Sequence, residues 1–338
     1  MDCPWCRSPT RVSDSRQRRN GSITHRRREC MKCGKRFSTK EFIKGMNINF
    51  TYITEAIRNV TEEYLIKSRR KSVVLGISGG IDSTLCSALI QPVCQKLGVT
   101  FIGRSISIES NKLDELKRAR DVGCAFCGDF KEVDLTNLYL AKKMAYEEEE
   151  NSSFTKIDGG NLKARTRMEY LYWIASKEKG LVLSTDNLTE WLLSFWTLHG
   201  DVGDYSMIQN LWKTEVYGLT EYLFNSISSN VRKNQKALIN LKAQALNDAL
   251  YAIPTDGLGI SNSDLDQIMP GWEMEFDNCR DAYARVDIIL QEYLDLIEIK
   301  ANKSIIKEKE NNPVIQRHLN SEFKRNNPYN IPREVLIK

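Results

Sequence analysis

Residues 78–83 read Ser-Gly-Gly-Ile-Asp-Ser, a short stretch whose residue types and position suit phosphate binding. An apolar, β-branched run at residues 73–77 precedes this stretch, and a segment with helical apolar spacing follows it. Backbone N–H groups at the start of a helix attract anions, and glycines let the backbone approach them closely. Asp82 could hold a magnesium ion beside such an anion. The pattern therefore predicts a phosphate-binding loop between a buried strand and a helix.

This loop differs from the Walker A loop, which needs G-x-x-x-x-G-K-[ST] and has no match in the chain. It resembles the PP-loop of enzymes that split ATP into AMP and pyrophosphate. The alternative is an ordinary strand–turn–helix corner that binds nothing. The resemblance implies ATP as a substrate and an α/β fold.

Four cysteines near the N-terminus form a second group with the spacing of a functional site. They make two Cys-x-x-Cys pairs with 23 residues between the pairs, and they are Cys3, Cys6, Cys30 and Cys33. Four thiolates at this spacing can close a tetrahedral zinc site with zinc–sulfur bonds of about 2.3 Å. So small a module buries too little apolar surface to fold unaided, and structural zinc contributes on the order of 10–16 kcal/mol. Two disulfides are the alternative.

The charge of the chain is unevenly distributed. Residues 1–44 carry 13 Lys and Arg against 4 Asp and Glu, a balance of +9 in a chain of net charge +5. The remainder carries 36 basic and 40 acidic residues, a balance of −4, which predicts two modules with different partners. Basic side chains beside exposed aromatic rings at Trp5 and Phe37 suit nucleic acid, and a solvated basic face is the alternative. The basic residues are Arg16, Arg18, Arg19, Arg26, Arg27, Arg28, Lys35 and Arg36.

Several N-terminal motifs carry a family resemblance. They are Cys-Pro-x-Cys at residues 3–6, Asp-Ser-Arg at 14–16, Arg-Arg-Arg-Glu-Cys at 26–30 and Cys-Gly-Lys-Arg-Phe-Ser-Thr at 33–39. These motifs resemble the zinc ribbon of bacterial NrdR, the repressor of ribonucleotide reductase genes. The resemblance implies DNA or RNA as a partner, but the ATP-cone domain that follows the ribbon in that family is absent here. We expect a zinc ribbon over residues 1–44 and a larger domain over residues 46–338.

The rest of the composition suggests a cytoplasmic protein. Hydrophobic residues make up 41% of the chain, and no apolar run approaches the roughly 20 residues that a membrane span needs. Asp2 follows Met1 without a signal-peptide pattern, so the nine cysteines are expected to be reduced or metal-bound. Cys124 and Cys127 lack the second pair that a zinc site needs. Core thiols are expected at Cys86, Cys94 and Cys279.

Alternating apolar segments predict the architecture of the larger domain. Strands are expected at residues 73–77, 99–108, 130–135 and 180–184. One helix is expected to bury Ile53, Ala56, Ile57, Val60 and Tyr64, a second follows the PP-loop until Pro92 kinks or ends it, and a third spans residues 112–122. Strands that alternate with helices predict a doubly wound parallel sheet, with ligands at the carboxyl ends of the strands.

Further motifs follow the loop. They are Gly-Asn-Leu-Lys-Ala-Arg-Thr-Arg-Met at residues 160–168, Thr-Asp-Asn-Leu-Thr-Glu at 185–190, Thr-Leu-His-Gly-Asp-Val-Gly-Asp at 197–204, Leu-Trp-Lys-Thr at 211–214, Pro-Thr-Asp-Gly-Leu-Gly at 254–259 and Phe-Lys-Arg at 323–325. Together they resemble ammonia-dependent NAD synthetase, a PP-loop family with an adenine nucleotide alpha-hydrolase-like fold. The resemblance implies that the nicotinate carboxylate of deamido-NAD attacks ATP, giving an adenylate and pyrophosphate. Ammonia then displaces AMP to give NAD.

The same resemblance implies roles for individual residues, although each alone also suits a solvated helix face or a turn. Asp82 and Glu190 would bind magnesium, and together with Lys213 they are the expected catalytic residues. The expected ATP contacts are Ser78, Gly79, Gly80, Asp82, Ser83, Thr185, Lys213 and Thr255. The expected deamido-NAD contacts are Arg165, Asp204 and Lys324.

Three positions depart from the family pattern. Leu198 stands where the family often has a lysine, Phe323 stands where a histidine frequently precedes the C-terminal lysine, and residues 107–111 replace a Leu-Pro type of loop. The chain before the PP-loop is too short for an amidohydrolase-like domain, so free ammonia or a separate donor is expected as the nitrogen source. Family members are homodimers with active sites at the subunit interface, which implies a homodimer here.

Two other functions remain open from the sequence. A tRNA thiolase would combine a PP-loop with a zinc ribbon and use Cys124 and Cys127 to handle sulfur, although the motifs at residues 160–168 and 254–259 argue against it. A nucleic-acid-binding regulator would use the synthetase-like domain as a nucleotide sensor.

Overall fold

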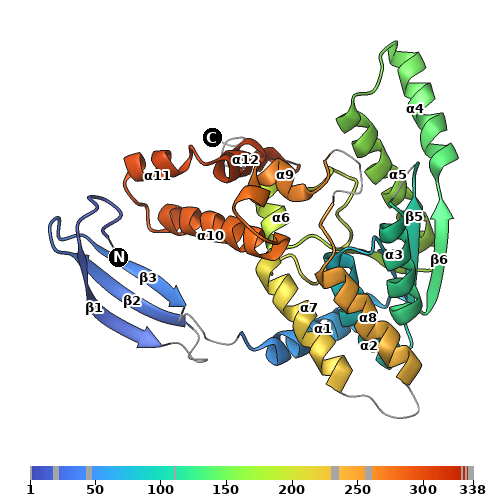
Figure 1. Cartoon of the computed structure of the whole chain (residues 1–338), viewed down its shortest axis with the longest axis horizontal. Coiled ribbons are helices and arrows are strands. Elements are labelled where there is room, and N and C mark those ends of the chain that lie inside the picture. The colour runs from blue at the N-terminus through green and yellow to red at the C-terminus, as the bar shows by residue number, and fades with distance from the viewer. Residues whose placement is uncertain are drawn as a thin grey trace.

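The computed structural model describes residues 2–17, 23–42, 48–109, 112–229, 236–255, 261–328, 330–331 and 333. These residues form a small antiparallel sheet near the N-terminus and a parallel five-stranded sheet flanked by helices (Figure 1). The small sheet has the order β1-β2-β3 and consists of β1 (Thr10–Gln17), β2 (Ile23–Cys30) and β3 (Arg36–Phe42). The expected fold class, a doubly wound α/β sheet with an N-terminal ribbon, is confirmed.

The parallel sheet has the order β6-β5-β4-β7-β8. Its strands are β4 (Ser72–Gly76), β5 (Thr100–Ser107), β6 (Asp129–Asp134), β7 (Gly180–Ser184) and β8 (Tyr205–Ser206). The four expected strands are present, whereas β8 is too short for a sequence pattern. The chain winds outwards in opposite directions from β4, so β4 and β7 flank the switch point at which such sheets bind ligands.

Both faces of the sheet are covered because successive strand residues point to opposite sides. Val73 and Leu75 of β4 belong to one apolar cluster, and Val74 belongs to another. The first cluster includes residues of α1 (Phe50–Ser68), α2 (Ile81–Leu97), α3 (Leu113–Phe126), α7 (Lys213–Ser229) and α8 (Lys236–Leu250). The second includes residues of α4 (Thr136–Glu150) and α5 (Lys156–Lys177).

The helix after the PP-loop does not end at Pro92. Helix α2 continues to Leu97 with Pro92 inside it. Pro92 has no N–H to donate to the carbonyl of Ala88, four residues earlier. Arg58 of α1 fills that place, because its Nη2 donates to the Ala88 oxygen at 3.1 Å. A donor from a neighbouring helix therefore satisfies the carbonyl that proline leaves free.

The buried face of α1 also differs from the expectation. Val60 is 59% exposed and Tyr64 is 38% exposed, whereas Thr54, Thr61 and Leu65 are buried. The two threonines tolerate burial because each hydroxyl donates to a carbonyl of its own helix, at 2.7 Å in both cases. The apolar pattern therefore predicted the wrong buried face for α1, because it included Val60 and Tyr64 and left out Thr54 and Thr61.

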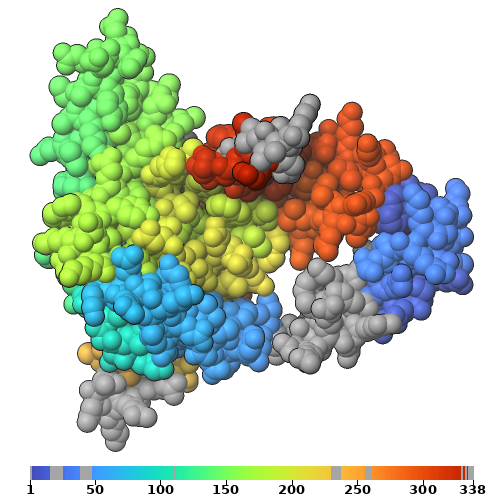
Figure 2. Space-filling view, turned by 180° about the vertical axis from the view of Figure 1, so that it is seen from behind, coloured from blue at the N-terminus to red at the C-terminus, as the bar shows by residue number. Residues whose placement is uncertain are grey.

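Helices after β7 form the remainder of the described chain. They are α6 (Leu188–Leu193), α9 (Asp264–Ile268), the short 3₁₀ helix η2 (Trp272–Met274), α10 (Cys279–Glu298), α11 (Lys303–Lys309), α12 (Pro313–Asn320) and α13 (Glu322–Arg325). In the space-filling view the blue ribbon lies against the orange part of the chain that contains α10 and α11 (Figure 2). No helix among the described residues is long and apolar enough to cross a membrane.

Candidate active site and zinc cluster

The PP-loop joins the carboxyl end of β4 to the N-terminus of α2. Gly80 is the N-cap residue of α2 and offers no side chain to its first N–H groups. The hydroxyls of Ser78 and Ser83 lie 3.0 Å apart, and Ser78 Oγ also accepts from Gly80 N–H at 3.2 Å. The loop therefore presents backbone donors and two hydroxyls to the space beyond the strand, as a phosphate site requires.

Gly79 is the residue of the loop that only glycine can occupy. Its φ of +77° lies in the left-handed region, and an added Cβ would lie 2.7 Å from the backbone nitrogen of Ala119 and 2.9 Å from the carbonyl oxygen of Glu115. Arg118 Nε also approaches the Gly79 carbonyl, at 3.3 Å. The loop is thus packed directly on α3.

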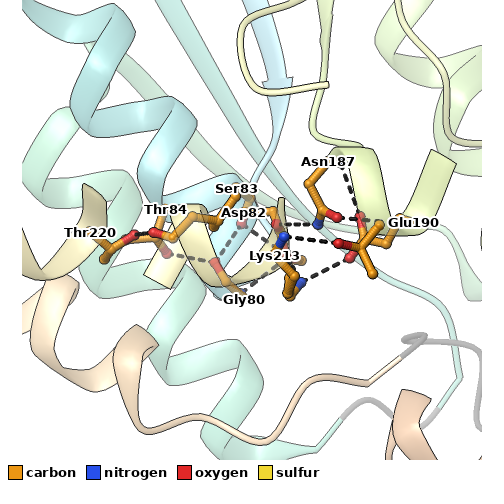
Figure 3. A network of polar contacts seen from close by, with 11 residues as sticks. Gly80, Asp82, Ser83, Thr84, Asn187, Glu190, Lys213 and Thr220 are labelled. Atoms are coloured by element: carbon orange, nitrogen blue, oxygen red, sulfur yellow. Dashed lines mark hydrogen bonds and ion pairs between the residues drawn. The ribbon is translucent and has the colours of Figure 1, made fainter. Parts of the chain in front are cut away.

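A buried lysine joins the two carboxylates that were expected to bind magnesium. Lys213 Nζ lies 2.6 Å from Asp82 Oδ2 and 2.8 Å from Glu190 Oε1 (Figure 3). Asn187 Nδ2 donates to the other oxygen of Asp82 at 2.9 Å. Asn187, which follows β7, is also the N-cap of α6 and forms a capping box with Glu190. One residue at the end of β7 therefore contacts both carboxylates that bind Lys213.

Burial and mutual repulsion govern the charges of this cluster. Lys213 is 1% exposed, and the carboxylates of Asp82 and Glu190 raise its pKa well above the ordinary value despite burial. Burial, followed by the charge of Asp82, raises the pKa of Glu190 to about 6. Burial also raises the pKa of Asp186 to about 8. The site is therefore rich in acidic groups, with one buried cation between two of them.

The donor set of Asp82 and Glu190 fits magnesium. Both carboxylates contact the same lysine nitrogen, so their oxygens lie close together with the Lys213 ammonium between them. Magnesium prefers oxygen ligands and commonly combines one or two carboxylates with phosphate oxygens. The PP-loop adjoins this pair, because Asp82 is the second residue of α2.

An open cavity of about 690 Å³ lies beside the cluster. Thr185, at the end of β7, lines it, and so does Thr255, whose hydroxyl donates to Glu115 Oε1 at 2.9 Å. Asp256 and the rest of the motif up to Gly259 lie outside the described residues. Other expected residues that line the cavity are Ser78, Gly80, Asp82, Ser83, Glu190 and Lys213. All of the expected ATP residues except Gly79 therefore line one cavity.

The three residues expected to contact deamido-NAD are less closely grouped. Lys324 lines the cavity, and its Nζ donates to the Trp196 carbonyl at 2.6 Å. Arg165 is exposed, with its Nε bonded to the Leu198 carbonyl at 3.2 Å, and does not line the cavity. Asp204 caps the edge of β7 by accepting from Val182 N–H at 2.9 Å. Among the three, only Lys324 lines the described cavity.

Sequence reasoning missed several polar residues of the cavity wall. Asp186, Asp201, Arg167, Arg118 and Arg317 all line it. Asp201 accepts from Thr197 N–H at 2.6 Å, and burial raises its pKa. The signal for Asp186 and Asp201 was present, because both lie within motifs at residues 185–190 and 197–204, but turn-forming aspartates look the same in a sequence.

The four N-terminal cysteines form the second cluster. The sulfurs of Cys3 and Cys33 lie 3.6 Å apart, those of Cys6 and Cys30 lie 3.4 Å apart, and all four lie within 4.8 Å of one another. Disulfide bonds of about 2.05 Å are excluded by these separations. Tetrahedral zinc with about 2.3 Å bonds places its sulfurs about 3.8 Å apart, so the cluster fits zinc.

Hydrogen bonds to Cys6 and Cys30 favour metal binding by these two thiols. The amide N–H groups of Lys32 and Cys33 both donate to Cys30 Sγ at 3.3 Å, which lowers the pKa of that thiol. Hydrogen bonds from Ser8 lower the pKa of Cys6 to about 6. Such bonds favour the thiolate form that zinc requires.

The aromatic residues of the ribbon are not available for stacking on bases as expected. Phe37 is 6% exposed, and the Trp5 ring packs edge-on against it with centroids 5.5 Å apart. The Trp5 indole N–H donates to the carbonyl of Lys300, at the end of α10, at 3.0 Å. Trp5 therefore serves a contact within the molecule. The expectation of exposed aromatic rings was wrong because Trp5 packs on Phe37 and bonds to Lys300, a residue far away in the sequence.

The remaining cysteines take no part in either site. Cys86 and Cys94 are buried and Cys279 is half-buried, in agreement with core thiols apart from the partial exposure of the last. Cys127 packs over Gly103, and burial raises the pKa of its thiol to about 12. Cys124 is exposed, and neither residue of this pair lines the cavity.

Comparison with known proteins identifies both modules. A family model described as NAD synthase matches residues 53–328, and one described as the N-terminal domain of NrdR-like transcriptional repressors matches residues 1–41. The NH(3)-dependent NAD(+) synthetase of Methanosarcina mazei is 34% identical over 205 residues, which is 59% of this chain and 73% of the relative. That of Campylobacter jejuni subsp. doylei is 31% identical over 173 residues, or 51% of this chain and 67% of the relative.

Two solved structures share the fold. The NMN synthetase of Francisella tularensis has a TM-score of 0.59 and 22% identity, covering 85% of this chain and 99% of that one. The NH3-dependent NAD synthetase of Campylobacter jejuni in complex with nitrate has a TM-score of 0.57 and 21% identity, covering 85% and 100%. Together with the site geometry, these matches show that the chain belongs to the NAD synthase family and carries an NrdR-like zinc ribbon at its N-terminal end.

Proposed function

We propose that this chain catalyses the ATP-dependent amidation of deamido-NAD with ammonia, giving NAD, AMP and pyrophosphate. The observation that carries the proposal is the Asp82–Lys213–Glu190 cluster at the mouth of the PP-loop, on the wall of a cavity. Family membership and the names of the NH(3)-dependent relatives support the choice of substrates. Free ammonia as the nitrogen source rests on those names.

The first step joins two anions, the nicotinate carboxylate and the triphosphate. The N-terminus of α2 and the hydroxyls of Ser78 and Ser83 bind the pyrophosphate portion, and Thr185 and Thr255 line the nucleotide side of the cavity. Magnesium, held by Asp82 and Glu190, would neutralise charge on the phosphates. Lys213 lies within reach of the same volume and supplies a cation that burial keeps free of water.

The carboxylate oxygen bonds to the α-phosphorus of ATP, and the bond to the pyrophosphate oxygen breaks. Ammonia then adds to the carbonyl carbon of the adenylate, and AMP leaves with the former carboxylate oxygen. As the amide forms, the nitrogen that came from ammonia loses one proton to solvent. Lys324 lines the same cavity and would hold the second substrate there, while Arg165 and Asp204 do not line the cavity of this copy. A homodimer in which a second copy completes the deamido-NAD site would reconcile their positions with the expected contacts.

The test of the proposed function is a comparison of two acceptors in the presence of ATP, magnesium and ammonium. Purified full-length protein should form NAD from deamido-NAD, together with one AMP per NAD. Nicotinate mononucleotide is the matched acceptor, because it lacks only the adenylate half of deamido-NAD. A higher kcat/KM for nicotinate mononucleotide than for deamido-NAD would show that nicotinate mononucleotide is the preferred substrate. No amide product from either acceptor would overturn the proposed function.

The protonation of the Cys127 thiol argues against the tRNA thiolase alternative. A sulfur-handling cysteine needs an accessible thiolate, whereas burial raises the pKa of Cys127 to about 12. We therefore expect Cys124→Ser and Cys127→Ser together to leave NAD formation unchanged. A loss of activity in the folded double variant would bring sulfur chemistry back into consideration.

We further propose that the ribbon binds DNA or RNA through its basic residues. Arg27, Lys32 and Arg36 are exposed, and matched ribbon relatives are repressors by name. Such binding depends on phosphate contacts, so it should weaken steeply between 50 and about 200 mM salt. Gel-shift titrations of the full chain, with and without ATP, test it and the nucleotide-sensor alternative together. Affinity that does not respond to salt would contradict phosphate binding by the ribbon.

A further inference from the structure

The ribbon contacts the synthetase domain through the first zinc knuckle, the Cys3–Cys6 segment. The Trp5 indole donates to the Lys300 carbonyl at 3.0 Å, and Asn302 returns two bonds: its Nδ2 donates to the Trp5 carbonyl at 2.9 Å and its N–H donates to the Pro4 carbonyl at 3.2 Å. Arg7 also forms an ion pair with Glu308, but both side chains are exposed, so that pair contributes little. Three hydrogen bonds therefore attach this knuckle to the turn between α10 and α11 (Figures 1 and 2).

Both partners of this contact have a fixed shape. Pro4 and Trp5 lie between two of the four cysteines, so their carbonyls point as they do because the knuckle is closed. On the other side, Lys300 has a φ of +51°, and Asn302 caps α11 by accepting from Ser304 N–H at 3.0 Å. A zinc-free ribbon of this size loses its folded shape, and the contact would be lost with it.

Helix α10 connects this contact to the active site. Its Asp287 accepts from the Thr189 hydroxyl at 2.5 Å and from the Thr214 N–H at 3.0 Å. Thr189 Oγ1 in turn accepts from the backbone N–H of Lys213 at 2.9 Å. The ring of Tyr283, also on α10, lies 5.3 Å from Lys213 Nζ. One helix thus holds the active-site lysine at its middle and the ribbon at its C-terminal end, about 20 Å away along the axis.

We propose that the zinc-loaded ribbon is a positioning element for the active site, because its knuckle binds the α10–α11 turn and stabilises the helix that holds Lys213. Loss of zinc would loosen the end of α10 and, through Asp287 and Tyr283, the placement of Lys213. This role goes beyond the synthetase reaction and beyond nucleic-acid binding by the ribbon. It gives the fusion of the two modules a structural consequence for catalysis.

The experiment uses Asn302→Asp in the full chain. Aspartate keeps the oxygen that caps α11, but it removes the Nδ2 donor and places a negative charge against the Trp5 carbonyl. The matched control is Asn312→Asp, because Asn312 caps α12 in the same way through Val314 N–H and makes no hydrogen bond to the ribbon among the described residues. Hydrogen exchange of peptides covering residues 279–306 is measured with zinc bound and after chelation.

The proposal predicts a several-fold faster exchange of these peptides in Asn302→Asp than in Asn312→Asp. Chelation should accelerate the exchange of the native chain at least as much, because it breaks all three hydrogen bonds. It should add less in Asn302→Asp, where loss of the Nδ2 donor and repulsion at the Trp5 carbonyl have already weakened the contact. Equal exchange in the two variants, or no effect of chelation on the native chain, would overturn the proposal. Trp5→Phe is a second variant that removes the indole donor and keeps an aromatic ring beside Phe37. Its peptides should also exchange faster than those of Asn312→Asp, and its zinc content is measured to show that the ribbon is intact.

A kinetic readout links the contact to the active site. In Asn302→Asp, kcat/KM for ATP should fall several-fold, with no comparable change in Asn312→Asp. If the chain makes no NAD at all, the exchange experiment still decides whether the ribbon stabilises α10. Failure of the proposed function can therefore be told apart from failure of this inference. Altered exchange with unchanged kcat/KM would refute the link to the active site.

Discussion

Lys213 is the residue on which the charge balance of the active site depends. Its ammonium group lies between Asp82 and Glu190, and the site contains two further buried carboxylates, Asp186 and Asp201. An uncompensated buried charge is expensive, so a lysine held at 1% exposure needs both partners. The same arrangement keeps a cation ready for the negative charge that develops on the phosphates.

Lys213→Met tests this role. The variant keeps the length of the side chain and loses the cation, so we expect kcat to fall by about 10²–10³-fold, as on removal of one group that stabilises transition-state charge. Lys242→Met is the control, because Lys242 is a half-buried lysine that bonds to Gln91 and does not line the cavity. Steady-state NAD formation measures both. An equal effect of the two variants would mean that Lys213 acts through folding alone.

Asp186 should make the stability of the chain depend on pH. Burial, with the charges of Glu190, Asp201 and Asp82, raises its pKa from 3.8 to about 8, so the folded state holds a proton that the unfolded state releases. The free energy of unfolding therefore falls as pH rises between these values, by up to about 1.4 kcal/mol per unit.

Asp186→Asn removes this titration while keeping an oxygen that can accept from Ser184. Relative to the variant, the native chain should lose on the order of 2 kcal/mol of stability from pH 5 to pH 7. Urea unfolding of the zinc-loaded proteins in magnesium-free buffer at both pH values measures the difference. Parallel pH profiles for the two proteins would show that Asp186 is ionised in the folded state throughout.

At the scale of elements, strands were predictable and helix details were not. The runs at residues 73–77 and 180–184 are apolar throughout because both sheet faces are buried, and that pattern is visible in a sequence. Of the two outcomes expected at Pro92, a kink or an end, the end was wrong because α2 continues to Leu97. The donor that satisfies the Ala88 carbonyl comes from Arg58, 30 residues away. The buried face of α1 was wrong because buried threonines bond to their own helix.

A double-mutant cycle tests the account of Pro92. Arg58→Met leaves the Ala88 carbonyl without a donor, and we expect a loss of about 1–3 kcal/mol of stability. In the Arg58→Met, Pro92→Ala double variant, the new N–H at position 92 can bond to that carbonyl, so part of the loss should return. Chemical unfolding measures all four proteins. Additive effects of the two substitutions would show that the carbonyl of Ala88 does not couple them.

At the scale of the whole molecule, the division into two modules follows from cysteine spacing and charge, because both are local properties of the sequence. Most of the expected ATP residues line one cavity because they follow β4 or β7, which are neighbours in the sheet. Lys213 and Thr255 reach the same cavity from later parts of the chain. The contact between Trp5 and the α10–α11 turn joins residues almost 300 positions apart, through backbone carbonyls that carry no sequence signal. No pattern in the sequence could have predicted it.

The most direct test of the proposed reaction follows the oxygen of the substrate carboxylate. Deamido-NAD labelled with ¹⁸O in its carboxylate is incubated with the full-length protein, ATP, magnesium and ammonium, and the products are examined by mass spectrometry. The account predicts NAD together with AMP that carries one ¹⁸O atom, because the carboxylate oxygen leaves with the α-phosphorus. Unlabelled AMP, or the absence of NAD, would contradict it.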